Sequence, residues 1–177
     1  MTTTETSRAQ AGMSGAQVEM SGLRSTAAGA GGFALVRDLV LLLARIGLGV
    51  IMVYHAKLEY DFGGSVSGVI AMFDEAGIPL AVVAGPLNLF GELIGGVAVI
   101  LGAAVRLVGV AMAVNMLGAW VFVHNSGLMA ADHNGPEFVI TLGLLSLVLA
   151  ATGSGRIGLD HLIEPRLRRR FAPNRKA

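Results

Sequence analysis

The sequence predicts an all-α integral membrane protein, a bundle of four transmembrane helices. Of its 177 residues, 54% are hydrophobic and only 14% are charged, a balance typical of membrane proteins and not of one soluble domain. Four mainly apolar runs are separated by short polar connections, and crossing a bilayer core takes roughly 20 such residues per helix. Lysine and arginine gather on one side of these runs, as expected of a multi-pass protein.

The four predicted spans cover residues 38–57, 80–103, 106–124 and 137–155. The fourth is the shortest, because its purely apolar part covers only residues 138–151, and it crosses only if its flanks enter the interface. The transmembrane domain therefore covers residues 37–155. Residues 1–36 are rich in Gly, Ala, Ser and Thr without an apolar core, which predicts a disordered polar tail and not a cleaved signal peptide.

The connection after the first span contains a further short helix. Val69, Ile70, Met72 and Phe73 follow one another at helical spacing, and a Gly and a Pro come shortly after them. This pattern predicts an interfacial helix over the mouth of the bundle, where it could form a lid.

The distribution of positive charge predicts the orientation. Eleven of the 13 Lys and Arg residues fall in the amino-terminal tail, the second connection or the carboxy-terminal tail, Lys57 is on the opposite side and Arg45 lies within the first span. Both termini are therefore predicted to be cytoplasmic, in a bacterial inner (plasma) membrane. The basic tail, residues 156–177, is expected to lie at the interface and attract anionic lipid, at about 1 kcal/mol per charge. A partner-docking tail is the alternative, and nothing indicates nucleic-acid binding.

Several kinds of site are excluded or weakly supported. The sequence has no cysteine, which excludes disulfides, thiol catalysis, iron–sulfur clusters and zinc–thiolate sites. The glycines form no nucleotide-binding pattern. A haem between His55 and His124 is conceivable, but a lone histidine on each of two spans is a weak signal. We assign no catalytic residue, no metal site and no covalently bound cofactor from the sequence.

Four polar residues are predicted to form a buried network inside the spans. Counted from the inner ends of their helices, Arg45, Glu92 and Asn115 lie roughly 10, 16 and 14 Å deep at the helical rise. Buried charges in membranes usually face the bundle interior in pairs, so we expect an Arg45–Glu92 ion pair, with Asn88 and Asn115 satisfying the remaining hydrogen bonds. A structural role for the pair is favoured over a proton relay, because a carboxylate beside arginine holds its charge firmly.

A second polar constellation is predicted at the outer face. It consists of His55, Lys57 and Glu59 at the end of the first span, His124 at the end of the third, and Asp132, His133 and Glu137 before the fourth. The candidate ligand-binding pocket takes His55, Lys57, His124 and Glu137 from this set. Histidine with carboxylate could bind a metal ion or donate hydrogen bonds to the carbonyls of a quinone headgroup. No ligand spacing is diagnostic, and histidines that cap helices and face water are the alternative, especially for His133.

Five segments, in this order, resemble the DoxX family of membrane proteins over about residues 38–163. They are LLLARIGLGVIMVYHAKLE, AGIPL, GELIGGVAVILGAAVR, AWVFVHNSGL and NGPEFVITLGLLSLVLAATGSGRIGLDHLI, of which the closing GSGRIGLDHLI is the most distinctive. The resemblance implies a four-helix membrane bundle whose family-pattern polar positions are Arg45, His55, Lys57, Glu92, His124 and Glu137. Ala56, where a glycine commonly follows the histidine, and Pro136, before Glu137, depart from the usual pattern.

The resemblance also directs the functional hypotheses. The family takes its name from a small subunit of a thiosulfate:quinone oxidoreductase, and similar proteins are associated with membrane oxidoreductase assemblies. The first hypothesis is an accessory membrane subunit of a bacterial redox or respiratory assembly, which contacts quinone and packs against other membrane subunits. The alternative is a non-catalytic structural or assembly protein. A transporter is less favoured, because no inverted repeat or broken helix pair is evident.

Overall fold

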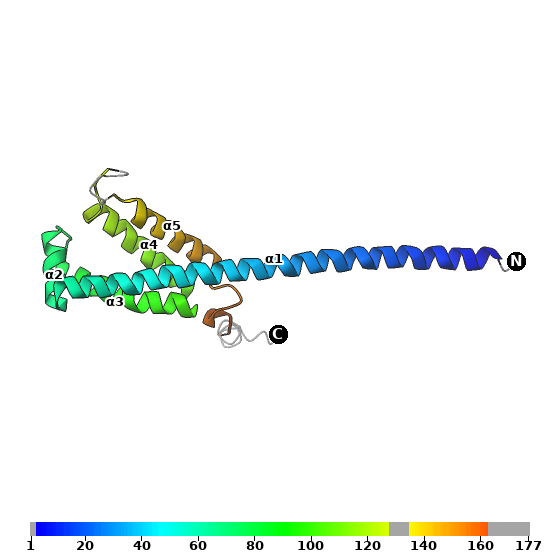
Figure 1. Cartoon of the computed structure of the whole chain (residues 1–177), viewed down its shortest axis with the longest axis horizontal. Helices are drawn as coiled ribbons and strands as arrows, with labels where there is room; N and C mark the ends of the chain where they lie inside the picture. Colours follow the sequence, from blue (N-terminus) through cyan, green and yellow to red (C-terminus); the bar gives the residue numbers. More distant parts are fainter. Residues whose placement is uncertain (1–2, 128–134, 163–177) are drawn as a thin grey trace, which may run out of the picture. The chain divides into compact units, whose positions relative to one another are not determined.

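The computed structural model describes residues 3–127 and 135–162, and side chains from residue 32 onward. All regular secondary structure in these ranges is helical, as Figure 1 shows: α1 (Thr3–Gly63), α2 (Val66–Glu75), α3 (Ala81–Leu101), α4 (Val105–Phe122) and α5 (Glu137–Thr152). Asp132 and His133, expected in the outer constellation, and most of the basic tail lie outside the described residues.

The chain divides into two units, residues 1–38 and 39–177. In the first, α1 already begins at Thr3, so the structure differs from the predicted disordered tail over residues 3–36. Ala, Gln, Met, Glu and Arg in this stretch have high intrinsic helix propensity, whereas its six glycines and its Ser and Thr residues do not. Propensity alone therefore does not account for this helix.

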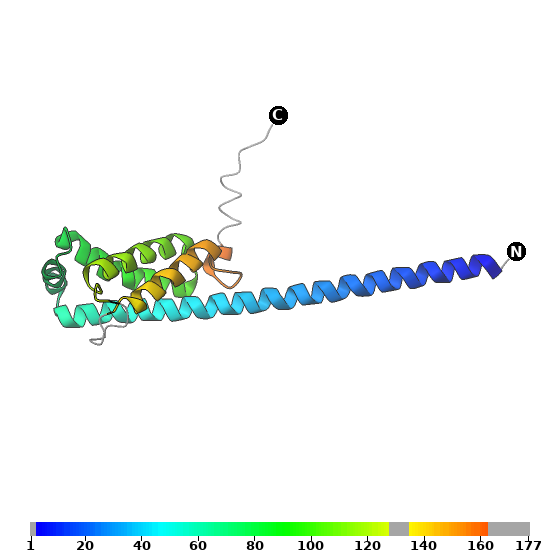
Figure 2. The same cartoon turned by 90° about the horizontal axis from the view of Figure 1, so that it is seen from above.

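The second unit is a helix bundle with α2 lying across one end of it (Figures 1 and 2). Three helices are long and apolar enough to cross a membrane, namely Gly32–Gly63, Ala81–Leu101 and Val105–Phe122. Large apolar side chains such as Val82 and Leu107 lie on the surface at 72% and 73% exposure, which suits contact with lipid and not with water. The all-helical, multi-pass class is therefore confirmed.

The fourth predicted span corresponds to α5, which has 16 residues. At the helical rise it is about 24 Å long, shorter than the roughly 30 Å hydrocarbon core. A complete crossing by α5, and the orientation of the termini, stay predictions.

Glycine sets the contact between α1 and α3. A Cβ atom added at Gly96 would lie 2.8 Å from the carbonyl oxygen of Gly49, so the two backbones touch where neither helix has a side chain. His55 lies six residues beyond Gly49 along α1, and Glu92 lies four residues before Gly96 along α3. Because the helices run antiparallel, this register brings His55 and Glu92 to one level.

The short helix α2 covers the end of this pair. Its Val69 is completely buried and packs with Ala56 of α1 and Leu89 of α3. Ser65 caps its start, because the hydroxyl oxygen accepts a hydrogen bond from the Gly68 amide at 3.1 Å. The predicted short helix is confirmed, and its apolar face points into the bundle.

After α5, residues 153–162 fold back to the connection between α3 and α4. The Asp160 carboxylate accepts hydrogen bonds from the backbone amides of Ala104 at 2.6 Å and Val105 at 3.0 Å. The Asp160 amide in turn donates to the carbonyl oxygen of Gly102 at 2.9 Å. An acidic side chain from the end of the chain thus caps the amino terminus of α4.

Arg45 completes this end of the bundle. Its side chain is fully buried, and Nη2 donates to the carbonyl oxygen of Ile157. Gly102, at φ +73°, and Gly158 pack directly against the guanidinium, leaving no space for a Cβ atom at either position. We call Arg45, Gly102, Ile157, Gly158 and Asp160 the inner clamp.

Candidate functional site

Three ionisable side chains meet between α1 and α3, and we call His55, Glu59 and Glu92 the outer cluster. His55 and Glu59 are four residues apart and therefore share one face of α1. The Nδ1 atom of His55 lies 3.0 Å from Oε2 of Glu92 and 3.8 Å from Oε1 of Glu59. One ring nitrogen thus faces both carboxylates.

Two amides hold the carboxylates in place. Asn115 of α4 donates from Nδ2 to Oε1 of Glu92 at 2.9 Å. Asn88 of α3 donates from Nδ2 to both oxygens of Glu59, at 2.8 Å each. The Glu92 side chain is 3% exposed and that of Glu59 15%, so three helices supply the partners that such buried carboxylates need.

Among the described residues, no Lys or Arg side chain contacts the outer cluster. The two basic residues nearest to His55 along α1 are engaged elsewhere: Lys57 pairs with Asp61 at the surface, and Arg45 belongs to the inner clamp. Two carboxylates this close together in an apolar setting repel each other. The outer cluster therefore requires a proton or a bound cation.

The His55 ring is also open on one side. Its side chain is 44% exposed, and Nε2, on the far edge of the ring, has no hydrogen-bond partner within residues 3–127 and 135–162. The outer cluster therefore presents one free ring nitrogen from an otherwise apolar bundle.

The predicted Arg45–Glu92 ion pair is wrong. Glu92 contacts His55 and Asn115, whereas Nη2 of Arg45 donates to a backbone carbonyl and its Nε and Nη1 have no partner among the described groups. Arg45 lies ten residues before His55, about 15 Å along the helix, and Glu92 lies level with His55. The depths of roughly 10 and 16 Å counted from the sequence differ by about 6 Å, which the two side chains could bridge, but the observed register separates the two positions by about 15 Å.

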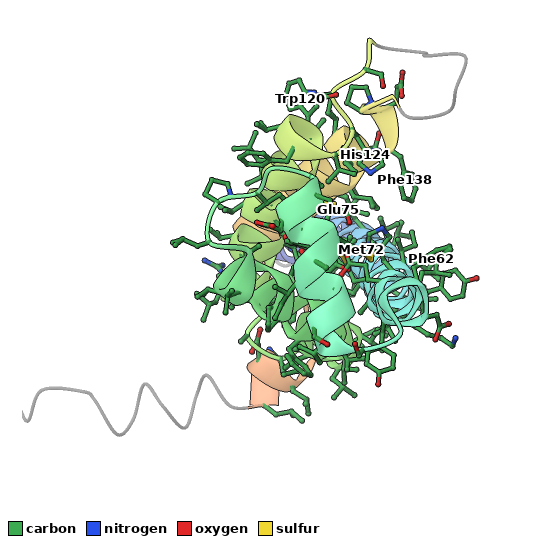
Figure 3. All side chains as sticks on the ribbon, turned by 90° about the vertical axis from the view of Figure 1, so that its left-hand side faces the viewer. Phe62, Met72, Glu75, Trp120, His124 and Phe138 are labelled. Atoms are coloured by element: carbon green, nitrogen blue, oxygen red, sulfur yellow. The ribbon has the colours of Figure 1, made fainter. Side chains whose placement is uncertain are left out.

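The described contacts do not join the four residues of the predicted outer pocket. Lys57 lies at the surface beside Asp61, and the Glu137 carboxylate lies against Gly135 at the start of α5. His124 is half-buried just beyond α4, and Figure 3 shows it at the end of the bundle that faces the viewer. No described contact joins these residues to His55, so the common pocket of His55, Lys57, His124 and Glu137 stays a prediction.

The sequence places Glu59 at the outer face, but Glu59 belongs neither to the predicted buried network nor to the predicted ligand-binding pocket. Two signals could have found its role. The spacing of His55 and Glu59 puts them on one helical face, and matching Gly49 with Gly96 sets the register that brings Glu92 opposite.

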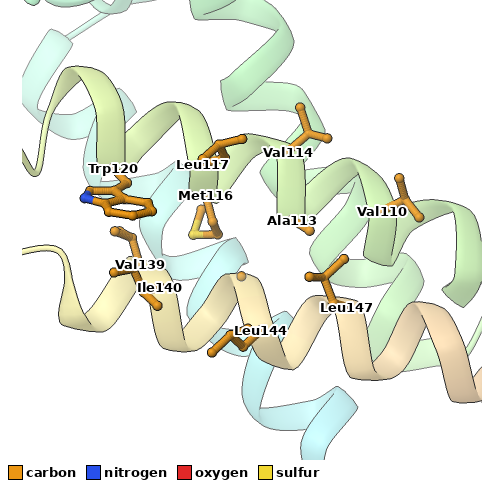
Figure 4. Close-up of a pocket in the computed structure, with 11 residues that line it drawn as sticks. Val110, Ala113, Val114, Met116, Leu117, Trp120, Val139, Ile140, Leu144 and Leu147 are labelled. Carbon is orange, nitrogen blue, oxygen red and sulfur yellow. The ribbon is translucent and has the colours of Figure 1, made fainter.

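Two apolar cavities accompany the bundle. A groove of about 340 Å³ runs between α4 and α5 (Figure 4), lined by Val110, Ala113, Val114, Met116, Leu117, Trp120, Val139, Ile140, Gly143, Leu144 and Leu147. A second, of about 350 Å³, lies on α1, α2 and α3, lined by Val53, Ala56, Lys57, Tyr60, Val66, Leu89, Phe90 and Leu93. None of the three outer-cluster residues lines it. Both cavities suit apolar chains or rings, and both offer hardly any polar group for a headgroup.

Two comparisons with known proteins give matches. The DoxX family model matches residues 40–125, a range that contains the whole outer cluster. "Putative oxidoreductase CatD" of Bacillus subtilis (strain 168) is 36% identical over 124 residues, which cover 69% of this chain and 85% of that protein. No solved structure matches the chain.

Proposed function

This chain belongs to the DoxX family, and we propose that it is an integral-membrane accessory subunit of a bacterial redox or respiratory assembly that contacts quinone at His55. The observation that carries the proposal is the position of this ring. Nδ1 is held by Glu92 at 3.0 Å, while Nε2 is open at the edge of an apolar bundle.

A quinone is the ligand that this environment favours. Its headgroup oxygens need a hydrogen-bonding partner, and the rest of the molecule is apolar and dissolves in lipid. With both ring nitrogens protonated, His55 donates from Nδ1 to Glu92 and from Nε2 to a quinone carbonyl oxygen, and the carboxylates behind the ring fix its orientation.

The electrons are assigned to a partner. Reduction of a quinone to a quinol takes two electrons and two protons, and this sequence has no cysteine to hold an iron–sulfur cluster. We therefore propose that another membrane subunit carries the redox centre and that this chain binds and positions the quinone. The name of the relative from Bacillus subtilis, which describes it as an oxidoreductase, supports a redox context.

The distribution of Lys and Arg supports an orientation of the protein in its membrane. We propose that the protein lies in the bacterial inner membrane with both termini cytoplasmic, because eleven of 13 basic residues fall on that side. The basic end of the chain would then meet anionic lipid. Reporter fusions at each terminus and in the connection that contains α2 would test this orientation.

Photoaffinity labelling tests the quinone site. The full-length protein is reconstituted in lipid nanodiscs, labelled with an azido-ubiquinone and mapped by mass spectrometry. We expect label on α1 or α3 near His55, competed by unlabelled decylubiquinone and lost in His55→Ala. His161→Ala, an exposed histidine beside the inner clamp, is the matched control and should label normally. Equal labelling of His55→Ala at normal protein abundance would remove the proposal.

A further inference from the structure

We infer that His55, Glu59 and Glu92 bind one divalent transition-metal ion inside the bundle. This site goes beyond the proposed quinone contact and does not depend on it. The three side chains each offer one ligand atom, and these atoms all lie within 4.8 Å of one another.

The separations fit a single ion. At metal–ligand distances of about 2.0–2.2 Å, tetrahedral geometry puts neighbouring ligand atoms roughly 3.3–3.6 Å apart. The two separations from Nδ1, 3.0 Å to Glu92 and 3.8 Å to Glu59, lie on either side of this range. The ligand atoms of Glu59 and Glu92 lie within 4.8 Å of each other, so binding of one ion would draw these two flexible side chains closer together.

The ligand types and charges fit as well. Imidazole with two carboxylates is a donor set that suits zinc, manganese or ferrous iron. Two carboxylates and a divalent cation sum to zero charge, which removes the cost of placing two like charges in an apolar bundle. One proton would leave one negative charge, whereas two protons, one on His55 and one on a carboxylate, would also neutralise the cluster; a metal ion differs in that it binds all three side chains at once.

The surrounding amides have the arrangement expected of a metal site. Asn115 binds Oε1 of Glu92 and leaves Oε2 toward His55, while Asn88 bridges both oxygens of Glu59. Such outer hydrogen bonds orient metal-binding carboxylates. The partial exposure of His55 leaves a route for the ion and a coordination position for water or another ligand.

Metal binding is compatible with the proposed function. An ion on Nδ1 places the ring proton on Nε2, so His55 keeps a hydrogen-bond donor on its open edge. Because metal binding is measured without quinone, failure of one proposal is distinguishable from failure of the other.

The test uses the full-length protein, purified in detergent, treated with EDTA and dialysed against Zn²⁺. We expect one Zn²⁺ per chain by elemental mass spectrometry, and with Co²⁺ the visible absorption bands of a low-symmetry site of four or five ligands. His55→Ala and Glu59→Gln should weaken Zn²⁺ binding by about 100-fold or more. Glu59→Gln retains an oxygen that accepts from Asn88, so it keeps the fold while losing the charge.

Two variants at exposed side chains serve as controls for this experiment. Asp61→Asn removes an exposed carboxylate two residues from Glu59, and His161→Ala removes an exposed histidine; both should bind Zn²⁺ as the wild type does. Size-exclusion profiles establish that each variant is folded. Folded wild-type protein that binds less than about 0.1 Zn²⁺ per chain, or His55→Ala that binds as tightly as wild type, would overturn the inference in favour of a protonated cluster.

Discussion

Helix α1 contributes to two polar regions that use charge in opposite ways. In the inner clamp, Arg45 is fully buried, donates to the Ile157 carbonyl and is enclosed by Gly102 and Gly158. In the outer cluster, about 15 Å away along the helix, His55 meets two carboxylates and leaves Nε2 open. The clamp has no room for a ligand, whereas the cluster has both an open edge and a missing positive charge.

The difference shows how a membrane bundle separates folding from binding. The buried guanidinium of Arg45 donates to a backbone carbonyl and so holds residues 153–162 against the end of α3. Removing one of these partners leaves the other buried without a hydrogen bond. A cluster of side chains with excess negative charge is stabilised when it binds a cation. Substitutions in the inner clamp should therefore reduce folded protein, and conservative ones in the outer cluster should reduce binding.

The largest effect is expected from Gly102→Ala. A Cβ atom there would overlap Nη1 of Arg45 and lie 2.7 Å from Cα of Gly158, at a backbone φ of +73°. Overpacking and left-handed strain each cost about 1–3 kcal/mol, so we expect a destabilisation of roughly 2–5 kcal/mol and a large drop in thermal midpoint by fluorescence-detected unfolding.

Gly91→Ala is the control for that experiment. Gly91 lies inside α3, the helix that Gly102 caps, and a Cβ atom added at Gly91 would have no atom within 4 Å. Alanine is the better helix former, so the thermal midpoint should stay or rise slightly. Equal losses in both variants would mean that α3 tolerates no change and that Arg45 is not tightly enclosed.

Asn115→Leu should have the next largest effect. It tests whether the hydrogen bond from Asn115 to Glu92 supports metal binding by the outer cluster. Glu92 would lose the donor at 2.9 Å, and an unsatisfied buried group costs about 1–3 kcal/mol. Zn²⁺ affinity should fall by roughly 10- to 100-fold, as for other outer hydrogen bonds to metal ligands. Unchanged thermal midpoint and Zn²⁺ affinity would show that Asn115 does not support Glu92.

The contrast also explains what could be predicted from sequence. The apolar runs predicted α3 and α4 to within a few residues, because lipid surrounds every turn of a spanning helix. The helical spacing of apolar residues predicted α2. Glu92 and Asn115 were recognised because polar groups are costly at such depth. The partner of Arg45 was missed, since the carbonyl of Ile157 reaches it only through the backbone path of residues 153–162, which no periodicity describes.

Asp160→Ala is a milder test of the inner clamp. The Asp160 carboxylate accepts from Ala104 and Val105 at the start of α4, and loss of such a cap costs about 0.5–2 kcal/mol. We expect a moderate fall in thermal midpoint with Zn²⁺ binding unchanged, because this residue is far along the bundle from His55. A change in Zn²⁺ affinity larger than the change in stability would show that the two regions are coupled.

The smallest effect is expected from Lys57→Gln, although Lys57 is only two residues from His55 and was predicted to line a common pocket. Its side chain is 65% exposed and pairs with Asp61, itself 51% exposed, so water screens the pair and its loss should not move the thermal midpoint measurably. Zn²⁺ affinity should also stay at the wild-type value, because the ammonium does not compensate Glu59 or Glu92. Tighter Zn²⁺ binding in Lys57→Gln would mean that this charge does act on the carboxylates, and the outer cluster would then extend to the surface of α1.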